Sequence, residues 1–431
     1  MSTSPDKQAR RGGRSPLLFI FLTVFIDLLG FGIVIPLLPT YSNAYGASVP
    51  LVGILMASFS AMQFVFAPMW GRLSDRIGRR PVLIGGLVGT AGAYVLFAFA
   101  HSLPLLFASR LLAGFFGANV STAQAYIADV TTPENRTKGM GLIGAAFGLG
   151  FCLGPLIGGE MSKVSSGAPG WFAAGLSLCA ATFGYFMLPE PPRGAREASR
   201  VFSLDQVRHA ATDKRIGTLF VLSFVFIFAF SSFESMFTLF GMYLFPKVFH
   251  LDHAVEKASM EELLRAAPVA GRYLAGIGII SAIIQGGLIR RLVPRFGEPT
   301  LAIFGPVLLG LGFLVVACAG LAESWSLVIV GCLLMPLGFG LNNPALSGLI
   351  SRATPAEKQG AYLGLNQSTS SLARMCGPPI AGLIFYQFGP SSPFFFATLL
   401  LVLSALLAGW YRTRYGASFP RTAKSVVPAE T

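Results

Sequence analysis

The sequence predicts an all-α integral membrane protein with twelve transmembrane helices, arranged as two pseudo-symmetric six-helix bundles. Three observations support this prediction. Hydrophobic residues make up 53% of the 431 residues, whereas charged residues make up 12%. The hydrophobic residues gather in runs of about twenty, the length that one helix needs to cross the hydrocarbon core of a membrane. Finally, the positive charges lie mostly on one side of these runs, and the same motifs occur in both halves of the chain.

Each apolar run is expected to be a helix, because backbone groups that face lipid must form their hydrogen bonds within one segment. The predicted spans are 16–39, 50–70, 81–101, 104–128, 138–160, 169–189, 216–245, 270–291, 299–321, 325–349, 359–387 and 393–412. The start of the chain is basic like that of a signal peptide, but the first span is too long for one and no cleavage site follows it. We therefore expect the first span to be retained.

The distribution of Lys and Arg predicts the orientation of these spans. With twelve spans, both termini and the even-numbered connections share one side of the membrane, and that side carries all but seven of the 32 Lys and Arg residues. Positive residues are enriched on the cytoplasmic side, so both termini are predicted to be cytoplasmic. The net charge of +13 then reflects collars that face anionic lipid headgroups, and it requires no nucleic-acid partner.

The chain is predicted to be a duplication. The longest cytoplasmic connection is charged and rich in proline, and six spans lie on each side of it. A Gly-Pro pair at Gly154 follows Thr132 by 22 residues, and a second pair at Gly377 follows Thr354 by 23 residues. In proteins built this way, the substrate site lies between the halves near mid-membrane. We divide the chain into a basic amino-terminal segment (1–15), a first bundle (16–189), a linker (190–215), a second bundle (216–412) and a tail (413–431).

Several function classes lack support in the sequence. All five cysteines fall inside predicted spans without paired spacing, so neither a disulfide framework nor a metal cluster is expected. His250 and His253 form an H-x-x-H pair outside the spans, which we interpret as solvated histidines rather than a metal site. The spans contain no catalytic constellation, and the chain contains no nucleotide-binding loop. The sequence therefore predicts neither an enzyme nor an ATP-driven pump, and no metal or other cofactor.

Four stretches stand out for their glycines and charges. One is Gly71-Arg72-Leu73-Ser74-Asp75-Arg76-Ile77-Gly78-Arg79-Arg80, and another, in span five, comprises Gly141, Gly150, Gly154-Pro155 and Gly158-Gly159. The other two run from Asp27 to Pro39 in span one and from Arg110 to Gly114 in span four. Together they resemble the signatures of the major facilitator superfamily, and within it the twelve-span drug:proton antiporters that include the tetracycline exporters. The resemblance covers the whole chain and implies transport by alternating access.

The basic stretch between spans two and three has two interpretations. Gly71 and Gly78 permit a tight cytoplasmic turn between two helices, in which the arginines anchor the topology. The resemblance implies instead a conformational gate, formed by Gly71, Asp75, Arg76, Gly78, Arg79, Arg80 and Asp129. In this gate, a buried Asp75 lies nearby while Asp129 pairs with Arg79 and locks the outward-open state. An ion pair that exists in one conformation stabilises that conformation alone, as a switch requires.

Span five carries a stripe of glycines. Gly150, Gly154 and Gly158 recur every four residues, so they lie on one face of a helix and allow another helix to approach closely. Pro155 is expected to bend the helix axis. The resemblance implies that this helix packs against a helix of the other half, seals the leak path and forms a hinge. The counterpart in span eleven keeps Gly377, Pro378, Pro379 and Gly382.

We single out four ionisable residues inside the spans: Asp27, Arg110, Glu234 and Arg374. Each costs about 2.5–3.5 kcal/mol at mid-membrane unless it is paired or hydrated. Asp27 and Glu234 lie on the first helix of each half, where a carboxylate in an apolar site can exchange protons near neutral pH. We predict that one of them carries a coupled proton, with Arg110 as a conformational partner. A structural ion pair for Asp27 and a substrate contact for Glu234 are the alternatives.

Polar residues cluster in the same helices. The candidates for lining a substrate cavity are Asn119, Gln124, Asn342, Asn343, Asn366, Gln367 and Arg374. Hydrogen bonds between helices, worth about 0.6 kcal/mol each, are the alternative role for them. The long connection 246–269 contains Ser259-Met260-Glu261-Glu262, a capping-box pattern that predicts a short surface helix at the outer mouth.

The resemblance implies secondary active export, in which protons entering down their gradient drive a small lipophilic or amphipathic compound out. The partners are then this compound, protons and the lipid bilayer, and the protein acts as a monomer in the cell inner (plasma) membrane. The alternative is a proton-coupled transporter of a physiological metabolite, by export or by symport. Tetracycline is not expected as the substrate, because tetracycline exporters carry an acidic residue just before the tyrosine of span three. This chain has Ala93 there, before Tyr94.

Overall fold

The computed structural model describes residues 16–117, 119–131, 133–190, 212–355 and 359–416, and these ranges contain helices but no β-strand. The first half contains α1 (Pro16–Val34), α2 (Leu37–Ala44), α3 (Val49–Ile77), α4 (Arg79–Ala98), α5 (Leu103–Phe116), α6 (Asn119–Val130), α7 (Pro133–Ser162) and α8 (Ala168–Met187). The second half contains α10 (Lys214–Leu244), η3 (Val255–Lys257), α11 (Met260–Ile283), the π-helical turn η4 (Ile284–Leu288), α12 (Ile289–Phe296), α13 (Glu298–Leu321), α14 (Trp325–Ala353), α15 (Gln359–Phe388) and α16 (Ser392–Tyr415).

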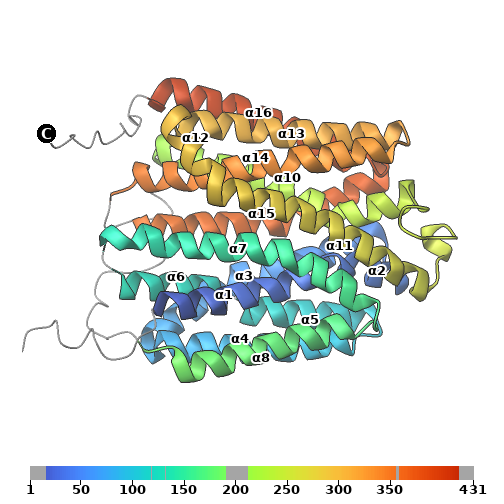
Figure 1. Ribbon diagram of the computed structural model, residues 1–431, viewed down its shortest axis with the longest axis horizontal. Helices are drawn as coiled ribbons and strands as arrows, with labels where there is room; N and C mark the ends of the chain where they lie inside the picture. The colour runs from blue at the N-terminus through green and yellow to red at the C-terminus, as the bar shows by residue number, and fades with distance from the viewer. Residues whose placement is uncertain (1–15, 118, 132, 191–211, 356–358, 417–431) are drawn as a thin grey trace, which may run out of the picture.

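These helices correspond to the twelve predicted spans. In the described ranges, nine helical segments are long and apolar enough to cross a membrane, and one of them joins α1 to α2. The other three predicted spans correspond to α5 with α6, to α7 and to α15. The first half and the second half lie on opposite sides of the molecule, and the ends of α1 and α16 nearest the termini lie at the same end (Figure 1). We call this the termini end, and the opposite one the far end.

The two halves meet along two helix pairs. Helix α7 of the first half packs against α11 of the second, and α15 of the second half packs against α3 of the first. In Figure 1, α7 and α15 both run through the middle of the molecule in this view, between the outer helices of the two halves. Both pairs join a helix that carries a Gly-Pro motif to a helix of the other half, as expected for a duplicated chain.

Two predicted boundaries are wrong. Helix α3 continues through the basic motif as far as Ile77, so the expected turn after residue 70 is reduced to Gly78. A helix can extend beyond the membrane because its backbone groups are already paired, and charged side chains then face water. The capping box at Ser259 and Glu262 is present, but it opens α11 itself at Met260 rather than a separate surface helix.

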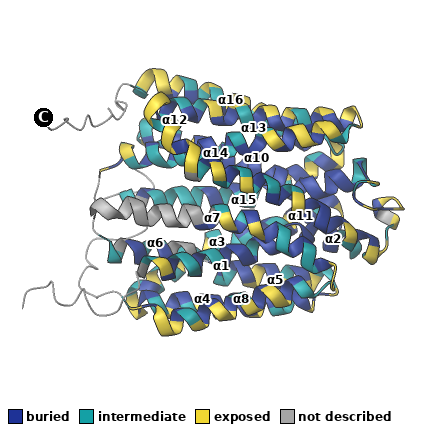
Figure 2. Ribbon diagram, viewed as in Figure 1, coloured by how far each residue is buried: buried dark blue, intermediate teal, exposed yellow. Residues whose placement is uncertain are grey.

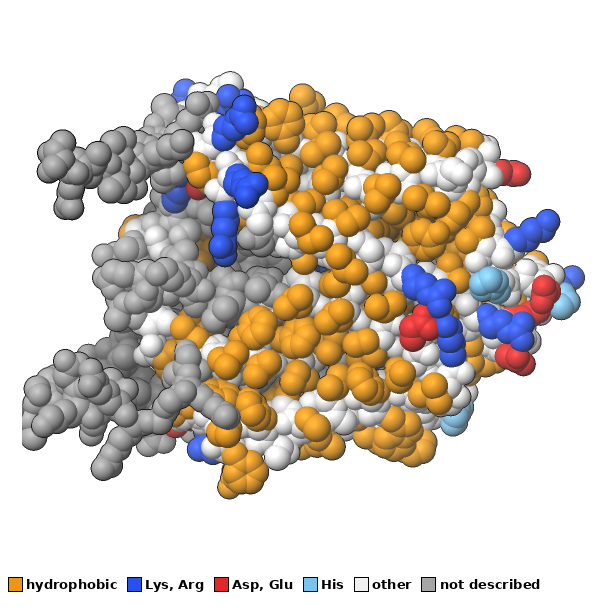
Figure 3. Space-filling view, in the orientation of Figure 1, with side chains coloured by type: hydrophobic (Ala, Val, Ile, Leu, Met, Phe, Trp, Pro, Cys, Tyr) orange, Lys and Arg blue, Asp and Glu red, His pale blue; other side chains and the backbone are white. Residues whose placement is uncertain are grey.

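The surface matches a membrane environment. Buried residues line the contacts between helices, and exposed positions lie on the outward faces (Figure 2). Many of these exposed positions are large and apolar, including Phe186, Phe388 and Leu321, which are 75%, 74% and 73% exposed. Figure 3 shows hydrophobic side chains across the middle of one face and most of its charged side chains toward the two ends. Such an apolar belt is stable in contact with lipid, whereas in water it would cause aggregation.

Candidate functional site

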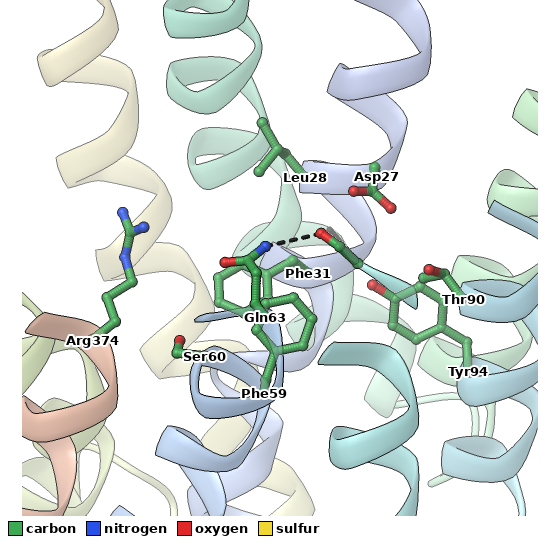
Figure 4. Close-up of a pocket in the computed structure, with 10 residues that line it drawn as sticks. Asp27, Leu28, Phe31, Phe59, Ser60, Gln63, Thr90, Tyr94 and Arg374 are labelled. Atoms are coloured by element: carbon green, nitrogen blue, oxygen red, sulfur yellow. Dashed lines mark hydrogen bonds between the residues drawn. The ribbon is translucent and has the colours of Figure 1, made fainter. Parts of the chain in front are cut away.

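A narrow cavity of about 20 Å³ lies where α1, α3, α4 and the end of α5 face α15. Its lining consists of Asp27, Leu28, Phe31, Phe59, Ser60, Gln63, Thr90, Tyr94, Gly117 and Arg374. Nine of these ten residues come from the first half, and Arg374 comes from the second. Figure 4 shows Asp27 and Arg374 on opposite sides, with Phe31 and Phe59 between them. The cavity therefore lies at the interface of the two halves, where the duplication predicts a substrate site.

Asp27 reaches the cavity from α1 and is 7% exposed. The Tyr94 hydroxyl of α4 packs against Gly30, which lies on α1 like Asp27. The approach is so close that a Cβ on Gly30 would lie 2.8 Å from Tyr94 Oη. Arg110 lies over aromatic rings, with its guanidinium carbon 5.7 Å from the Tyr94 centroid and 5.4 Å from that of Phe97. Tyr94 lines the same cavity as Asp27, and the Arg110 guanidinium lies over its ring. This tyrosine thus links the predicted proton carrier to its predicted partner.

Arg374 lines the opposite wall of the cavity from α15. Its guanidinium carbon lies 5.8 Å from the centroid of Phe151, which belongs to α7 in the other half. It also interacts electrostatically with Glu234 of α10, a buried residue with 8% exposure. Arg374 therefore lies between the cavity, Glu234 of the second half and Phe151 on α7 of the first half.

The other predicted cavity residues are placed elsewhere. Asn342 is buried against Gly305 of α13, and its amide atoms have no hydrogen-bond partner among the described residues. Gln124, Asn343, Asn366 and Gln367 are half-buried on α6, α14 and α15, and none belongs to the cavity lining given above. Asn119 begins α6, but its side chain lies outside the described residues.

Sequence reasoning missed the polar residues that do line the cavity, which are Ser60, Gln63 and Thr90. Gln63 Nε2 donates to the Gly117 carbonyl at 2.9 Å, and Ser371 Oγ donates to Gln63 Oε1 at 3.3 Å across the two halves (Figure 4 shows the first of these bonds). A lone glutamine in an otherwise apolar stretch of span two is the signal that could have identified it.

Arg79 is the centre of the network in the basic motif. Its side chain is 4% exposed, its Nε donates to Asp129 Oδ2 at 3.0 Å, and its Nη1 lies 2.7 Å from Asp75 Oδ1. Nη1 also donates to Ser74 Oγ at 2.6 Å. Asp75 was expected to be buried, but its side chain is 37% exposed. Because α3 continues into the motif, Asp75 lies on the outer side of the helix end rather than inside a closed turn.

The remaining gate residues are two glycines, Gly71 and Gly78, and two arginines, Arg76 and Arg80. Gly78 has a φ of 116° and joins α3 to α4, whereas Gly71 is helical and has open space around it. Arg76 is exposed at the end of α3. Arg80 lies 5.3 Å over the ring of Tyr185 and donates to the Tyr185 carbonyl. The turn therefore requires one glycine of this pair rather than both.

Glu190 completes this network, and sequence reasoning missed it. Its Oε1 accepts from the backbone N–H of Arg79 at 2.8 Å, and its Oε2 accepts from that of Arg80 at 3.0 Å. The carboxylate thereby satisfies two N–H groups at the start of α4, where the helix dipole also favours a negative charge. The signal in the sequence is a single acidic residue directly after an apolar span.

The span-five glycines pack differently from the prediction. Gly150, Gly154 and Gly158 face α1 of their own half, where they meet Leu28, Gly32 and Ile33. The contact with the other half is made by the neighbouring face of α7. There Gly159 packs on Ala267 and Pro268 of α11, and Cys152 packs on Gly278. The helix does pack against the other half, but the glycines of α11 allow the approach as much as those of α7.

The second half repeats this arrangement. Gly377 of α15 packs on Phe228 and Ser231 of α10, the first helix of its own half. Pro378 and Gly382 pack on α3 of the other half, against Gly53 and Val49. These contacts lie toward the far end, as do those between Gly159 and Pro268. The Arg79–Asp129 pair is therefore present while the two halves are in contact at the far end. That this pair locks the outward-open state stays a prediction.

An ion pair also joins the two halves at the far end. Arg272 of α11 donates from Nε to Glu160 Oε1 of α7 at 2.8 Å, and its Nη2 lies 2.7 Å from the same oxygen. Lys163 donates to the other oxygen, Glu160 Oε2. Glu160 thus pairs with two cationic side chains, Lys163 of the first half and Arg272 of the second.

In the described part of the chain, no group of three His, Cys, Asp or Glu side chains is placed to hold a metal ion. His253 Nδ1 lies 2.9 Å from Glu262 Oε1, and this hydrogen bond raises the pKa of His253. A raised pKa means that the pair contributes stability in acid and loses it as the pH rises through that pKa. His250 has a φ of 57° in the adjacent connection.

The comparisons with known proteins agree with this geometry. The family model for the Major Facilitator Superfamily matches residues 20–375 and 291–427. "Tetracycline resistance protein, class B" from Escherichia coli is 31% identical over 365 residues, covering 84% of this chain and 86% of that protein. "Multidrug resistance protein 1" from Bacillus subtilis (strain 168) is 31% identical over 403 residues, covering 91% of this chain and 96% of that protein.

Solved structures show the same fold. The human organic anion transporter MFSD10 (TETRAN) aligns with a TM-score of 0.69 at 26% identity, covering 94% of this chain and 100% of that chain. A bacterial homologue of the human lysosomal transporter Spinster aligns with a TM-score of 0.70 at 14% identity, covering 98% and 100%, which is a likeness of fold alone. The predicted fold class is confirmed, and the relatives are transporters rather than enzymes. The chain belongs to the major facilitator superfamily.

Proposed function

We propose that this protein is a proton-driven exporter of small lipophilic or amphipathic compounds, working by alternating access. The single observation that supports this best is Asp27, a carboxyl group buried on α1 in the wall of the cavity between the two halves. The relatives named for tetracycline and multidrug resistance are consistent with export of such compounds. Phe31, Phe59 and Tyr94 supply aromatic surface for an apolar guest in the same cavity.

Asp27 would couple the two fluxes through competition. A carboxylate buried among apolar side chains is costly when charged, so it gains from binding either a proton or a cationic group of the guest. If protonation and guest binding exclude each other at this site, the protein changes conformation with either a proton or a guest bound, and never with both. That exclusion is the requirement for antiport.

The conformational change would use the α7–α11 and α3–α15 interfaces. Both are close contacts between backbones at glycines, so they can form and separate as units rather than deform gradually. We further propose that both termini are cytoplasmic, that the protein resides in the cell inner membrane, and that it acts as a monomer. The excess of Lys and Arg at the termini end supports this orientation.

The test uses everted membrane vesicles with an acidic lumen and a pH-sensitive dye inside. A transported compound should raise the lumenal pH in vesicles that contain the wild-type protein, because protons leave as the compound enters. Asp27→Asn keeps the side-chain size and should abolish this response while the protein is still inserted. An unchanged response in Asp27→Asn would remove Asp27 from the coupling mechanism.

A second candidate function is proton-coupled transport of a physiological metabolite. Two observations favour it: Ala93 stands where tetracycline exporters carry an acidic residue, and a structural neighbour at 26% identity is described as an organic anion transporter. The same vesicles distinguish the two functions. A compound that enters the vesicles as protons leave supports proton-driven export. A compound that leaves the vesicles together with protons supports symport of a metabolite.

A further inference from the structure

Each half places one charged residue in the cavity wall and keeps a residue of the opposite charge outside the lining. The signs of these charges are reversed between the two halves. In the first half, Asp27 lines the cavity, whereas Arg110 is 1% exposed and lies over the rings of Tyr94 and Phe97. In the second half, Arg374 lines the cavity, whereas Glu234 is not part of its lining. The cavity thus has an acidic wall from α1 and a basic wall from α15, as Figure 4 shows.

Aromatic rings lie between these walls (Figure 4). The Phe31 and Phe59 centroids are 4.6 Å apart, and the Phe31 and Phe151 centroids are 5.7 Å apart. Phe151 in turn lies under the Arg374 guanidinium. Such a cluster offers ring faces and edges to a flat aromatic guest, and it holds the guanidinium in a fixed position.

We propose that the preferred guests are aromatic zwitterions, with an acidic group bound by Arg374 and a basic group directed toward Asp27. This inference rests on the proposed function, because it names the chemical class of compound that the same cavity accepts. A molecule of this kind places its negative end on the basic wall, its positive end on the acidic wall and its ring against Phe31 and Phe59.

Arginine suits an acidic group better than lysine would. Its planar guanidinium carries five N–H donors and can hold a carboxylate through two parallel hydrogen bonds. The cost of placing a charged guest in a poorly hydrated cavity is offset when each of its charges meets the opposite charge.

The test compares two fluorescent dyes that differ in one group: a rhodamine with a free carboxylate, and the methyl ester of the same dye. Binding to the purified protein in detergent is followed by fluorescence polarisation, without any gradient. We expect the free acid to bind about tenfold more tightly than the ester, since a charge-assisted pair contributes about that much. In Arg374→Gln the ratio of the two affinities should fall to about one, and in Arg374→Lys it should fall in part.

Arg412→Gln is the matched control, because it removes one positive charge from an exposed position on α16. It should keep the ratio of the wild type. The inference is overturned if the wild type binds the ester as tightly as the acid, or if Arg374→Gln weakens both dyes equally. If Arg374→Gln does not fold, an unchanged ratio in Arg374→Lys overturns it. Since no gradient is used, a failure here is separate from a failure of proton-driven export, which the vesicle experiment measures.

Discussion

Gly78 shows how a single residue can define a motif. Its φ of 116° lies in a region that side chains with a Cβ disfavour, and the Glu190 carboxylate lies where that Cβ would be, with Oε1 at 2.6 Å. The same carboxylate caps α4 through the N–H groups of Arg79 and Arg80. One glycine therefore permits both the break between α3 and α4 and the approach of Glu190.

Gly78→Ala should destabilise the protein by about 1–3 kcal/mol, because the backbone becomes strained and Glu190 must move away from the start of α4. Gly71→Ala is the control within the same motif, since no atom lies within 4 Å of its added Cβ. Thermal unfolding of the purified proteins measures both. A lower midpoint for Gly71→Ala than for Gly78→Ala would contradict this account of the motif.

At the scale of elements, the sequence predicts the helices well and their partners poorly. The length of an apolar run identifies a span because the membrane thickness sets that length. The predicted ends of a helix are wrong where the helix, like α3, continues into water. The stripe of Gly150, Gly154 and Gly158 correctly predicts close packing, but its spacing does not indicate whether the neighbour is α1 or α11. Asp27 and Arg374 could be found as charges in apolar runs, whereas their facing across a cavity depends on the tertiary arrangement.

The α7–α11 interface gives a prediction with an internal control. A Cβ on Gly278 would lie 2.6 Å from Cys152 Cα, whereas one on Gly276 would have open space. Gly278→Ala should therefore push α11 away from α7 and expose Cys152, which is 5% exposed in the structure. In a variant with Cys152 as its single cysteine, Gly278→Ala should increase the rate of maleimide labelling, and Gly276→Ala should not. Equal rates for the two variants would mean that this contact does not hold the halves together.

At the scale of the whole molecule, two kinds of contact between the halves lie close together at the far end. The glycine contacts provide packing, and the pair of Glu160 with Arg272 adds a charge interaction between α7 and α11. Both side chains of this pair are partly exposed, so its contribution is limited to about 0.2–1 kcal/mol. A term of this size changes the ratio of two conformations a few-fold without locking either one, which suits a transporter that must cycle.

Reversing the charges should reveal this term. Glu160→Arg places a third cation beside Lys163 and Arg272, so it should favour separation of the far end and speed the labelling of Cys152. Adding Arg272→Glu to this variant restores an opposite pair and should bring the rate back toward that of the wild type. If the double variant labels as fast as Glu160→Arg alone, the pair makes no contribution between the halves.

Proton release by the purified protein shows directly whether a guest and a proton compete for Asp27. A transported compound is added to the protein in weakly buffered detergent solution, and the pH is recorded at a value near neutral. If guest and proton exclude each other at Asp27, compound binding to the wild type should release protons, and binding to Asp27→Asn should release none. Binding that releases no protons from the wild type, or equal release from Asp27→Asn, would contradict proton-coupled export through this residue.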